Sequence, residues 1–440
     1  MPCKIKILFS AATVQQPFLS TGSLGAAPCV LGGGVLDGYA RLWLDARTGV
    51  SAASLVEVTL EGELLNTLES VPWGSLIAHQ GRKWLKFLRL TYTVALPDPD
   101  TLDRRYPLMV PWHFDIPNAI SGVDRDIDSD HGRGGALPPS ISLATESYDG
   151  AGDVWHRGKC GISYFVRARL LTRDGICHAE DRHPVLFIPT ATGVPPPLCV
   201  SDFPGEYCLA ASRSPSRILP FQGAPSVSIC TEEPAPLHFN LDNRSAFTTI
   251  PIQLLYRSSP TPSTHYENGP NARSTSPAEV HLVVDSSLEA ATVWSTLPQD
   301  AVPRLVKRDQ WPPVLVKKTE VCRAQNRKLC CSTWTPTERP AAENSRKSCM
   351  CGGWRSVAKL VYTYDSEHWP VPTFSGAFTS RRYTLIVMVR LEGLGDPKFR
   401  FRVPLQITCG TSPLETSHDF GARARIRTGS EDVGPLPSYT

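Results

Sequence analysis

Apolar and polar residues alternate with a period of two along many short stretches of this chain. That alternation is typical of β-strands with one buried face, and the Pro, Gly and Ser residues between the stretches favour turns. In the first half of the chain, strands are predicted at residues 3–9, 35–44, 53–61, 86–96, 106–116, 159–172 and 184–188. We expect the strands at 35–44 and 53–61 to pair with each other, and we expect Gly62 to end the second of them.

The second half of the chain shows the same alternation after a gap rich in Pro, Ser and Arg. Strands are predicted there at residues 226–230, 237–241, 248–256, 279–284, 314–318, 354–364, 382–391 and 398–408. The runs 357–364 and 383–391 are rich in β-branched and aromatic residues, which favours central strands. The whole pattern predicts an all-β fold with two immunoglobulin-type β-sandwich domains in tandem and long loops between strands.

Proline marks the predicted boundary between the two sandwiches. Residues 193–197 read Gly-Val-Pro-Pro-Pro, and three consecutive prolines form a stiff, extended spacer. The final residues of the chain lose all apolar periodicity and are disordered by composition. We therefore expect an N-terminal sandwich, a proline-rich linker, a C-terminal sandwich and a disordered tail, at residues 1–192, 193–225, 226–410 and 411–440 respectively.

Composition and charge narrow the class of protein. Of 440 residues, 40 are proline, nearly twice the usual share, which disfavours helices. A net charge of +3 does not indicate nucleic-acid binding, so no partner of that class is expected. No run approaches the ~18 apolar residues of a membrane span, and the first residues lack the apolar core of a signal peptide. Because the thirteen cysteines form no even disulfide framework, we expect a cytoplasmic protein with reduced thiols.

One segment carries a family resemblance. Residues 137–171 contain a Leu-Pro-Pro-Ser loop and then a strand whose alternate positions are Cys160, Ile162, Tyr164, Val166, Ala168 and Leu170. This segment resembles the N-terminal β-sandwich of arrestin-like proteins, especially the fungal-type alpha-arrestin trafficking adaptors. Similar strand patterns lie at residues 38–62, 106–117, 383–390 and 399–407. The resemblance covers most of residues 1–410, through patterns of strands rather than invariant motifs, and implies two arrestin-like sandwiches.

The resemblance also implies a function for the end of the chain. The fungal adaptors recruit WW-domain ubiquitin ligases through Pro-Pro-x-Tyr motifs, and this chain has the variant Leu436, Pro437, Ser438 and Tyr439 near its end. Pro437 favours an extended polyproline conformation for an aromatic groove, and Tyr439 would fill a second pocket. Leu436 replaces the first proline, so weaker binding is expected. The implied protein is a cytoplasmic adaptor, recruited to membranes, that links a transporter or receptor to a WW-domain E3 ubiquitin ligase for endocytosis.

A basic segment offers a second contact surface. Residues 304–359 contain thirteen Lys and Arg against four Asp and Glu, a local balance of +9. Such a patch fits the acidic or phosphorylated cytoplasmic part of a transporter or receptor, or anionic lipid headgroups. The alternative is a solvated loop between strands. The residues chosen for anionic contact are Arg323, Arg327, Lys328, Arg346 and Lys347.

The same segment holds a group of cysteines, namely Cys322, Cys330, Cys331, Cys349 and Cys351. Structural zinc sites usually show cysteine pairs two to four residues apart. Here the pairs are adjacent or separated by one residue, which is a poor chelating geometry. We therefore expect free thiols in an insertion between strands, and neither a metal nor another cofactor.

The sequence contains none of the common catalytic motifs. It has no HExxH, no GxSxG and no GxxxxGK[ST], so no enzyme activity is expected. Two alternatives to the ligase adaptor stay open. One is a scaffold of the retromer-subunit type, which has the same kind of fold without ligase recruitment. The other is a β-sandwich enzyme with an unrecognised site, which would show a pocket with clustered titratable groups.

Overall fold

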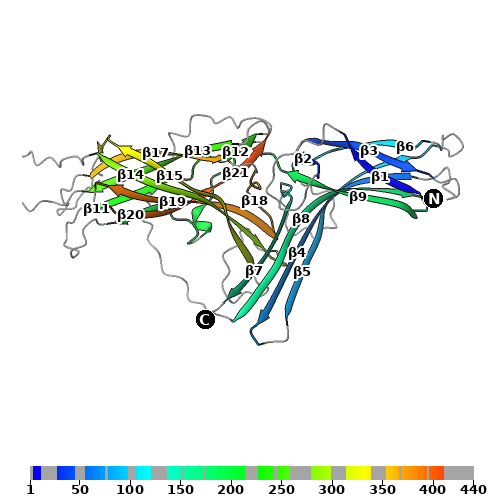
Figure 1. Cartoon of the computed structure of the whole chain (residues 1–440), viewed down its shortest axis with the longest axis horizontal. Coiled ribbons are helices and arrows are strands. Elements are labelled where there is room, and N and C mark those ends of the chain that lie inside the picture. The colour runs from blue at the N-terminus through cyan, green and yellow to red at the C-terminus, as the bar shows by residue number, and fades with distance from the viewer. Residues whose placement is uncertain are drawn as a thin grey trace, which may run out of the picture.

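The computed structural model describes residues 3–10, 27–44, 55–74, 78–97, 106–119, 136–149, 153–172, 174–191, 193–203, 205–213, 226–240, 245–257, 279–298, 314–337, 353–365, 369–393 and 396–410. In these residues the chain is almost entirely β-structure, with one short 3-10 turn at Val200–Asp202 (Figure 1). The prediction of an all-β fold is confirmed. No helix in the described part of the chain is long and apolar enough to cross a membrane.

The described strands of the N-terminal half form two sheets that face each other. They are β1 (Lys4–Phe9), β2 (Cys29–Leu31), β3 (Val35–Trp43), β4 (Leu55–Pro72), β5 (His79–Ala95), β6 (Leu108–Asp115), β7 (Ile141–Asp149), β8 (Val154–Leu171) and β9 (Cys177–Ile188). The smaller sheet has the order β1-β3-β6, and the larger has the order β2-β9-β8-β4-β5, with β7 paired to β8. Strands β4, β5 and β8 are long and extend beyond the smaller sheet (Figure 1).

The first hydrophobic core lies between these two sheets. Alternate side chains of β3, such as Leu36 and Leu42, are fully buried, and so is Val166 on β8. Trp112 of β6 is the largest of these side chains and packs edge-to-face on Phe9. Because the apolar residues recur every second position, one face of each strand supplies the core, as the sequence pattern requires.

The described strands of the C-terminal half form a second pair of sheets. They are β10 (Ala210–Arg213), β11 (Ser226–Thr231), β12 (Leu237–Asn240), β13 (Ser245–Arg257), β14 (Val280–Trp294), β15 (Leu315–Cys331), β16 (Thr335–Pro336), β17 (Gly353–Asp365), β18 (Phe374–Ser375), β19 (Thr379–Glu392), β20 (Lys398–Leu405) and β21 (Ile407–Gly410). One sheet has the order β10-β11-β13-β17-β16. The other has the order β15-β14-β19-β18, with β20 also paired to β19, and β12 and β21 form a short parallel pair.

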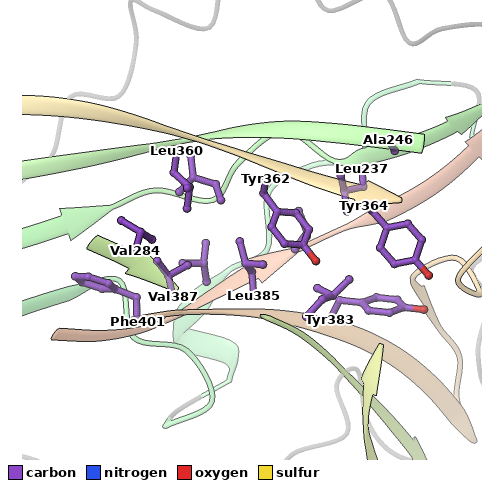
Figure 2. Packing of buried hydrophobic residues seen from close by; sticks show 14 of the residues in the cluster. Leu237, Ala246, Val284, Leu360, Tyr362, Tyr364, Tyr383, Leu385, Val387 and Phe401 are labelled. Atoms are coloured by element: carbon purple, nitrogen blue, oxygen red, sulfur yellow. The ribbon is translucent and has the colours of Figure 1, made fainter. Parts of the chain in front are cut away.

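The second core fills the space between these sheets (Figure 2). Leu360 and Tyr362 of β17 point toward Leu385 and Val387 of β19, and all four side chains are buried. Phe401 of β20 closes the same layer. The arrangement is that of a β-sandwich, in which side chains from the two inner faces interdigitate.

Each core is completed by residues from the other half of the chain. The second core includes Cys29 of β2 and Ile188 of β9. The first core includes Trp294 at the end of β14 and Leu315 at the start of β15, together with Val371. The two sandwiches therefore share buried apolar surface, which stabilises their contact by the same hydrophobic effect that stabilises each core.

One predicted strand pairing is wrong. The strand that begins at Val35 pairs with β1 and β6, whereas the strand that begins at Leu55 pairs with β5 and β8. Gly62 does not end that strand, which continues to Pro72 through a bulge at Gly62 and Glu63. Glycine suits this point because a Cβ there would lie 2.7 Å from the ring of Phe87.

Several segments expected to be loops are strands. The segment between the Leu-Pro-Pro-Ser loop and the strand predicted at residues 159–172 contains β7, and the segment expected to be a linker contains β10. The basic segment at residues 304–359 contains β15, a strand of 17 residues, of which only the first few lay in the strand predicted at residues 314–318. Polar side chains obscure these strands in the sequence because their outer faces meet solvent. Of the two strands expected to be central, β19 is central, but β17 has only the two-residue β16 on its outer side.

Candidate functional site

The predicted anion-contact residues Arg323, Arg327 and Lys328 all belong to β15. This strand pairs with β14 along its length and is outermost in the order of its sheet. An outermost strand has one edge without a strand neighbour in its sheet, and such an edge can pair with an extended segment of another chain. The structure therefore places these residues on a long strand at the margin of the second sandwich, rather than in a loop.

β15 is strongly basic. It contains one acidic residue, Glu320, and five basic residues, namely Lys317, Lys318, Arg323, Arg327 and Lys328. Basic residues on an edge strand discourage pairing with neutral chains, which is a common protection against aggregation. The same charges attract an acidic segment, so charge selects which extended chain can approach.

The lysines at the start of β15 are already engaged. Lys317 donates a hydrogen bond from Nζ to the backbone carbonyl of Ala144 on β7, at 2.7 Å. Lys318 lies 3.7 Å from Glu289 on β14. The first contact ties the beginning of β15 to the sheet of the N-terminal half.

The basic residues at the far end of β15 are more open. Lys328 forms an ion pair of 3.0 Å with Glu392 of β19, although its own side chain is 59% exposed. Arg327 is exposed and forms no ion pair with any residue that the structure describes. Arg327 is therefore placed to meet an external anion.

The side chains of the other predicted contact residues are not described. The side chain of Arg323 lies outside the described part, as do Arg346 and Lys347. The tail motif also lies outside the described residues, and its members are Leu436, Pro437, Ser438 and Tyr439. The structure thus describes Arg327 and Lys328 from the predicted set, with their side chains on opposite faces of β15, and the ligase motif stays a prediction.

The cysteines predicted to be free thiols in an insertion lie on β15 instead. Cys322, Cys330 and Cys331 form no disulfide within the described residues, while Cys349 and Cys351 lie outside them. Cys331 faces the second core, and burial raises the pKa of its thiol. Cys330 points to solvent on the opposite face of the strand.

One pair of side chains has the composition of a nucleophile and a base. The Oγ of Ser70 on β4 lies 2.8 Å from Nδ1 of His156 on β8, across paired strands. Ser70 is only 3% exposed, so its hydroxyl is covered rather than presented to a substrate. The contact is therefore best understood as a cross-strand hydrogen bond.

A buried polar contact joins the two sandwiches. Asn66 on β4 has no exposed surface, and its amide donates to the carbonyls of Ser295 and Phe378 at 3.0 and 3.1 Å. It also donates to Oγ1 of Thr379 on β19 at 3.0 Å. Cys160, opposite Asn66 on β8, lies near the same hydroxyl, and burial raises its pKa to about 12. Sequence reasoning missed Asn66, although a polar residue at an inward position of an alternating strand was a usable signal.

A buried ion pair holds the segment between the two sandwiches, residues 193–225, onto the second sandwich. Arg382 of β19 donates to both carboxylate oxygens of Glu206 at 3.2 and 3.0 Å, and both side chains are 6% exposed. The ring of Phe203 covers the guanidinium at 4.6 Å. The adjacent Arg381 is buried as well and donates to Oγ1 of Thr292 and to the hydroxyl of Tyr383. These arginines are structural residues that the sequence pattern did not separate from surface arginines.

An aromatic group lies where the end of β4 meets the end of β7 and the start of β8. Trp73, Tyr148 and Trp155 are 70%, 45% and 41% exposed. The ring centroid of Tyr148 lies 6.5 Å from that of Trp73 and 5.0 Å from that of Trp155. Tyr148 donates a hydrogen bond from its hydroxyl to Asp153 at 2.6 Å. Amphipathic aromatic side chains of this kind are enriched at protein interfaces.

Comparison with known proteins gives this chain no relative: no protein-family model matches it, and neither does any curated protein.

Proposed function

We propose that this protein is a non-enzymatic adaptor of the arrestin-like type. Its cargo is the cytoplasmic part of a membrane transporter or receptor, and its tail recruits a WW-domain E3 ubiquitin ligase. The resemblance of residues 137–171 to the fungal adaptors suggests the family, and the all-β architecture with two sandwich cores supports it. In this proposal the protein acts in the cytoplasm, is recruited to membranes by its cargo, and promotes ubiquitination and endocytosis.

The observation that carries the proposal is the basic outermost strand β15. Arg327 and Lys328 are exposed on it, and Arg327 has no ion-pair partner among the described residues. An acidic cargo segment in an extended conformation would gain main-chain hydrogen bonds from the strand edge and charge complementarity from these side chains. Anionic lipid is a second possible ligand for the same charges, and the experiment separates the two.

The cargo arm is tested by titrating the full-length protein with a fluorescent, extended glutamate-rich peptide and measuring anisotropy. We expect Arg327→Glu combined with Lys328→Glu to weaken binding by about 30-fold, because each basic residue near an anionic surface contributes roughly 1 kcal/mol. The matched control is Lys359→Glu together with Arg355→Glu on β17, in the opposite sheet. Equal weakening in both proteins would reject β15 as the contact surface, and binding to anionic vesicles but not to the peptide would reassign it to lipid.

The ligase arm is tested separately with a peptide of residues 430–440 and a panel of WW domains. Binding that is lost on Tyr439→Ala supports ligase recruitment through the tail. If no WW domain binds above that control, the ligase arm is rejected. The retromer-type scaffold, which needs no ligase, then becomes the better description, and it predicts a stable stoichiometric complex on purification.

A further inference from the structure

Three potential metal ligands meet where the beginning of β14 pairs with the end of β15. His281 lies directly opposite Cys330 in the register, and Glu279 precedes His281 by two residues, on the same side of the chain. The ligand atoms of these three residues all lie within 4.8 Å of one another. Cys330 Sγ donates a hydrogen bond to Oε1 of Glu279 at 2.7 Å.

The chemistry of this group is specific. Zn²⁺ accepts thiolate, imidazole and carboxylate ligands at about 2.0–2.3 Å, which places the ligand atoms of a tetrahedral site roughly 3–4 Å apart. Cys330 Sγ lies 2.7 Å from Oε1 of Glu279 and no pair of ligand atoms is more than 4.8 Å apart, so side-chain rotations that move these atoms by about 1 Å would close the site. Glu279 and Cys330 are exposed and His281 is half-buried, so an ion can reach all three from solvent.

The scaffold around the group is rigid. His281 and Cys330 sit on paired strands, so the backbone fixes their separation, and the next strand of the sheet, β19, places Glu392 opposite His281 on the other side. Lys328 and Arg390 lie near the group, but both form ion pairs with Glu392, at 3.0 and 3.1 Å. Their charges are therefore directed at Glu392 rather than at the three donor atoms.

We propose that Glu279, His281 and Cys330 form a Zn²⁺ site that joins β14 to β15, with its fourth position open to water. On binding, the Cys330 thiol loses its proton to solvent, and the thiolate, the imidazole nitrogen and a carboxylate oxygen of Glu279 each donate an electron pair to the metal. The site does not depend on the adaptor proposal, because it needs neither cargo nor ligase. It escaped the search for cysteine pairs because two of its three ligands are not cysteine and lie on the neighbouring strand.

The test uses Co²⁺ as a spectroscopic probe in the full-length, reduced protein. We expect one equivalent of Co²⁺ to produce a thiolate-to-cobalt charge-transfer band. We expect Zn²⁺ to displace the Co²⁺ and so remove the band. Cys330→Ser should abolish the band, while Glu279→Gln and His281→Ala should each weaken Co²⁺ binding by about 100-fold, at the upper end of the loss seen when a metal's supporting contacts are removed. Cys208→Ser removes another exposed, free cysteine and should leave the band intact.

Two results would overturn the proposal. One is a wild-type protein with no charge-transfer band at one equivalent of Co²⁺, and the other is a band that persists in Cys330→Ser, which would assign it to other cysteines. If Cys330→Ser does not fold, as judged by circular dichroism, Glu279→Gln decides the question, because this exposed substitution retains the thiol. Unchanged Co²⁺ affinity in that variant would reject the site.

Discussion

Two arginines of this protein, Arg382 and Arg327, have the same side chain and opposite surroundings. Arg382 is buried on β19, where its guanidinium donates two hydrogen bonds to Glu206 and the ring of Phe203 covers it. Arg327 is exposed on β15 and has no ion pair within the described residues. Burial makes the first arginine dependent on its partner, because removal of either charge leaves the other buried with neither a countercharge nor water to stabilise it. Exposure leaves the second arginine available for a ligand at almost no cost to the fold.

The comparison separates stability from recognition in this molecule. Polar residues that cross between elements in the interior, such as Asn66, Glu206 and Arg382, fix how the parts fit together. Polar residues on outermost strands, such as Arg327, leave the fit unchanged and determine what can approach. Substitutions in the two groups should therefore affect different measurements, and the predictions below are arranged by the size of the expected effect.

The largest effect is expected from the buried ion pair. Glu206→Gln should lower the free energy of unfolding by about 3–5 kcal/mol, because it leaves the guanidinium of Arg382 buried without a countercharge. The double variant Glu206→Leu with Arg382→Met should recover much of this loss, since replacement of a buried pair by apolar residues is often neutral. Urea unfolding measures both. A double variant as unstable as the single one would show that packing, rather than charge, explains the loss.

The buried amide at the junction should give the next largest effect. Asn66→Ala removes the donor to the carbonyl of Ser295, and an unsatisfied buried carbonyl costs about 1–3 kcal/mol, whereas the carbonyl of Phe378 keeps a hydrogen bond from the backbone N–H of Ser295. The matched control is Asn326→Ala, which removes a solvent-exposed hydrogen bond to Asp285 and should change stability by about 0.5 kcal/mol or less. Thermal unfolding of the two variants compares them directly. Equal shifts in Tm would mean that the junction does not depend on Asn66.

A smaller effect, dependent on pH, is expected at Glu61 of β4. Its side chain is 3% exposed and lies 2.6 Å from Nζ of Lys86. Burial is the largest influence and raises the pKa of Glu61, but the hydrogen bond and charge of Lys86, helped by Thr59 and Arg167, outweigh it and lower the pKa below its usual 4.5. A carboxylate with a lowered pKa contributes stability above its unfolded pKa and loses it as the pH falls.

The unfolding free energy should therefore decrease as the pH falls below about 4.5, the unfolded-state pKa of this carboxyl. In Glu61→Gln the decrease should be smaller, because an amide cannot take up the proton. Urea midpoints at a series of acidic pH values in the two proteins measure the difference. Parallel curves would show that other carboxyls carry the acid sensitivity.

The same contrast explains what the sequence could predict. Alternation identified most strands with a buried face, such as β8 and β19, because an inward face must be apolar. It missed β7 and gave only the first few residues of β15, because polar and charged residues occupy most of these two strands. It also mispaired the strand that begins at Val35, because alternation defines the faces of a strand and not its neighbours.

For the candidate sites, sequence reasoning found the basic charge but not its setting. Arg327 and Lys328 were selected by local charge alone, and the structure then placed them on an outermost strand. The group of Glu279, His281 and Cys330 could not be found in this way, because its members are far apart in the chain and meet only through the pairing of β14 with β15. Contacts made across strands depend on which strands pair, and the alternation within one strand defines its faces but not its neighbour.

The smallest effect on stability is expected from Arg327→Glu. This substitution should change the free energy of unfolding by about 0.5 kcal/mol or less, because the side chain is exposed and has no ion pair to lose within the described residues. Under the adaptor proposal, the same substitution should still weaken binding of an acidic extended peptide, so stability and binding respond separately. Urea unfolding and peptide anisotropy on one sample test both halves. A clear loss of stability would place Arg327 with Arg382, among the residues that hold the fold together, and would remove the distinction between the two arginines.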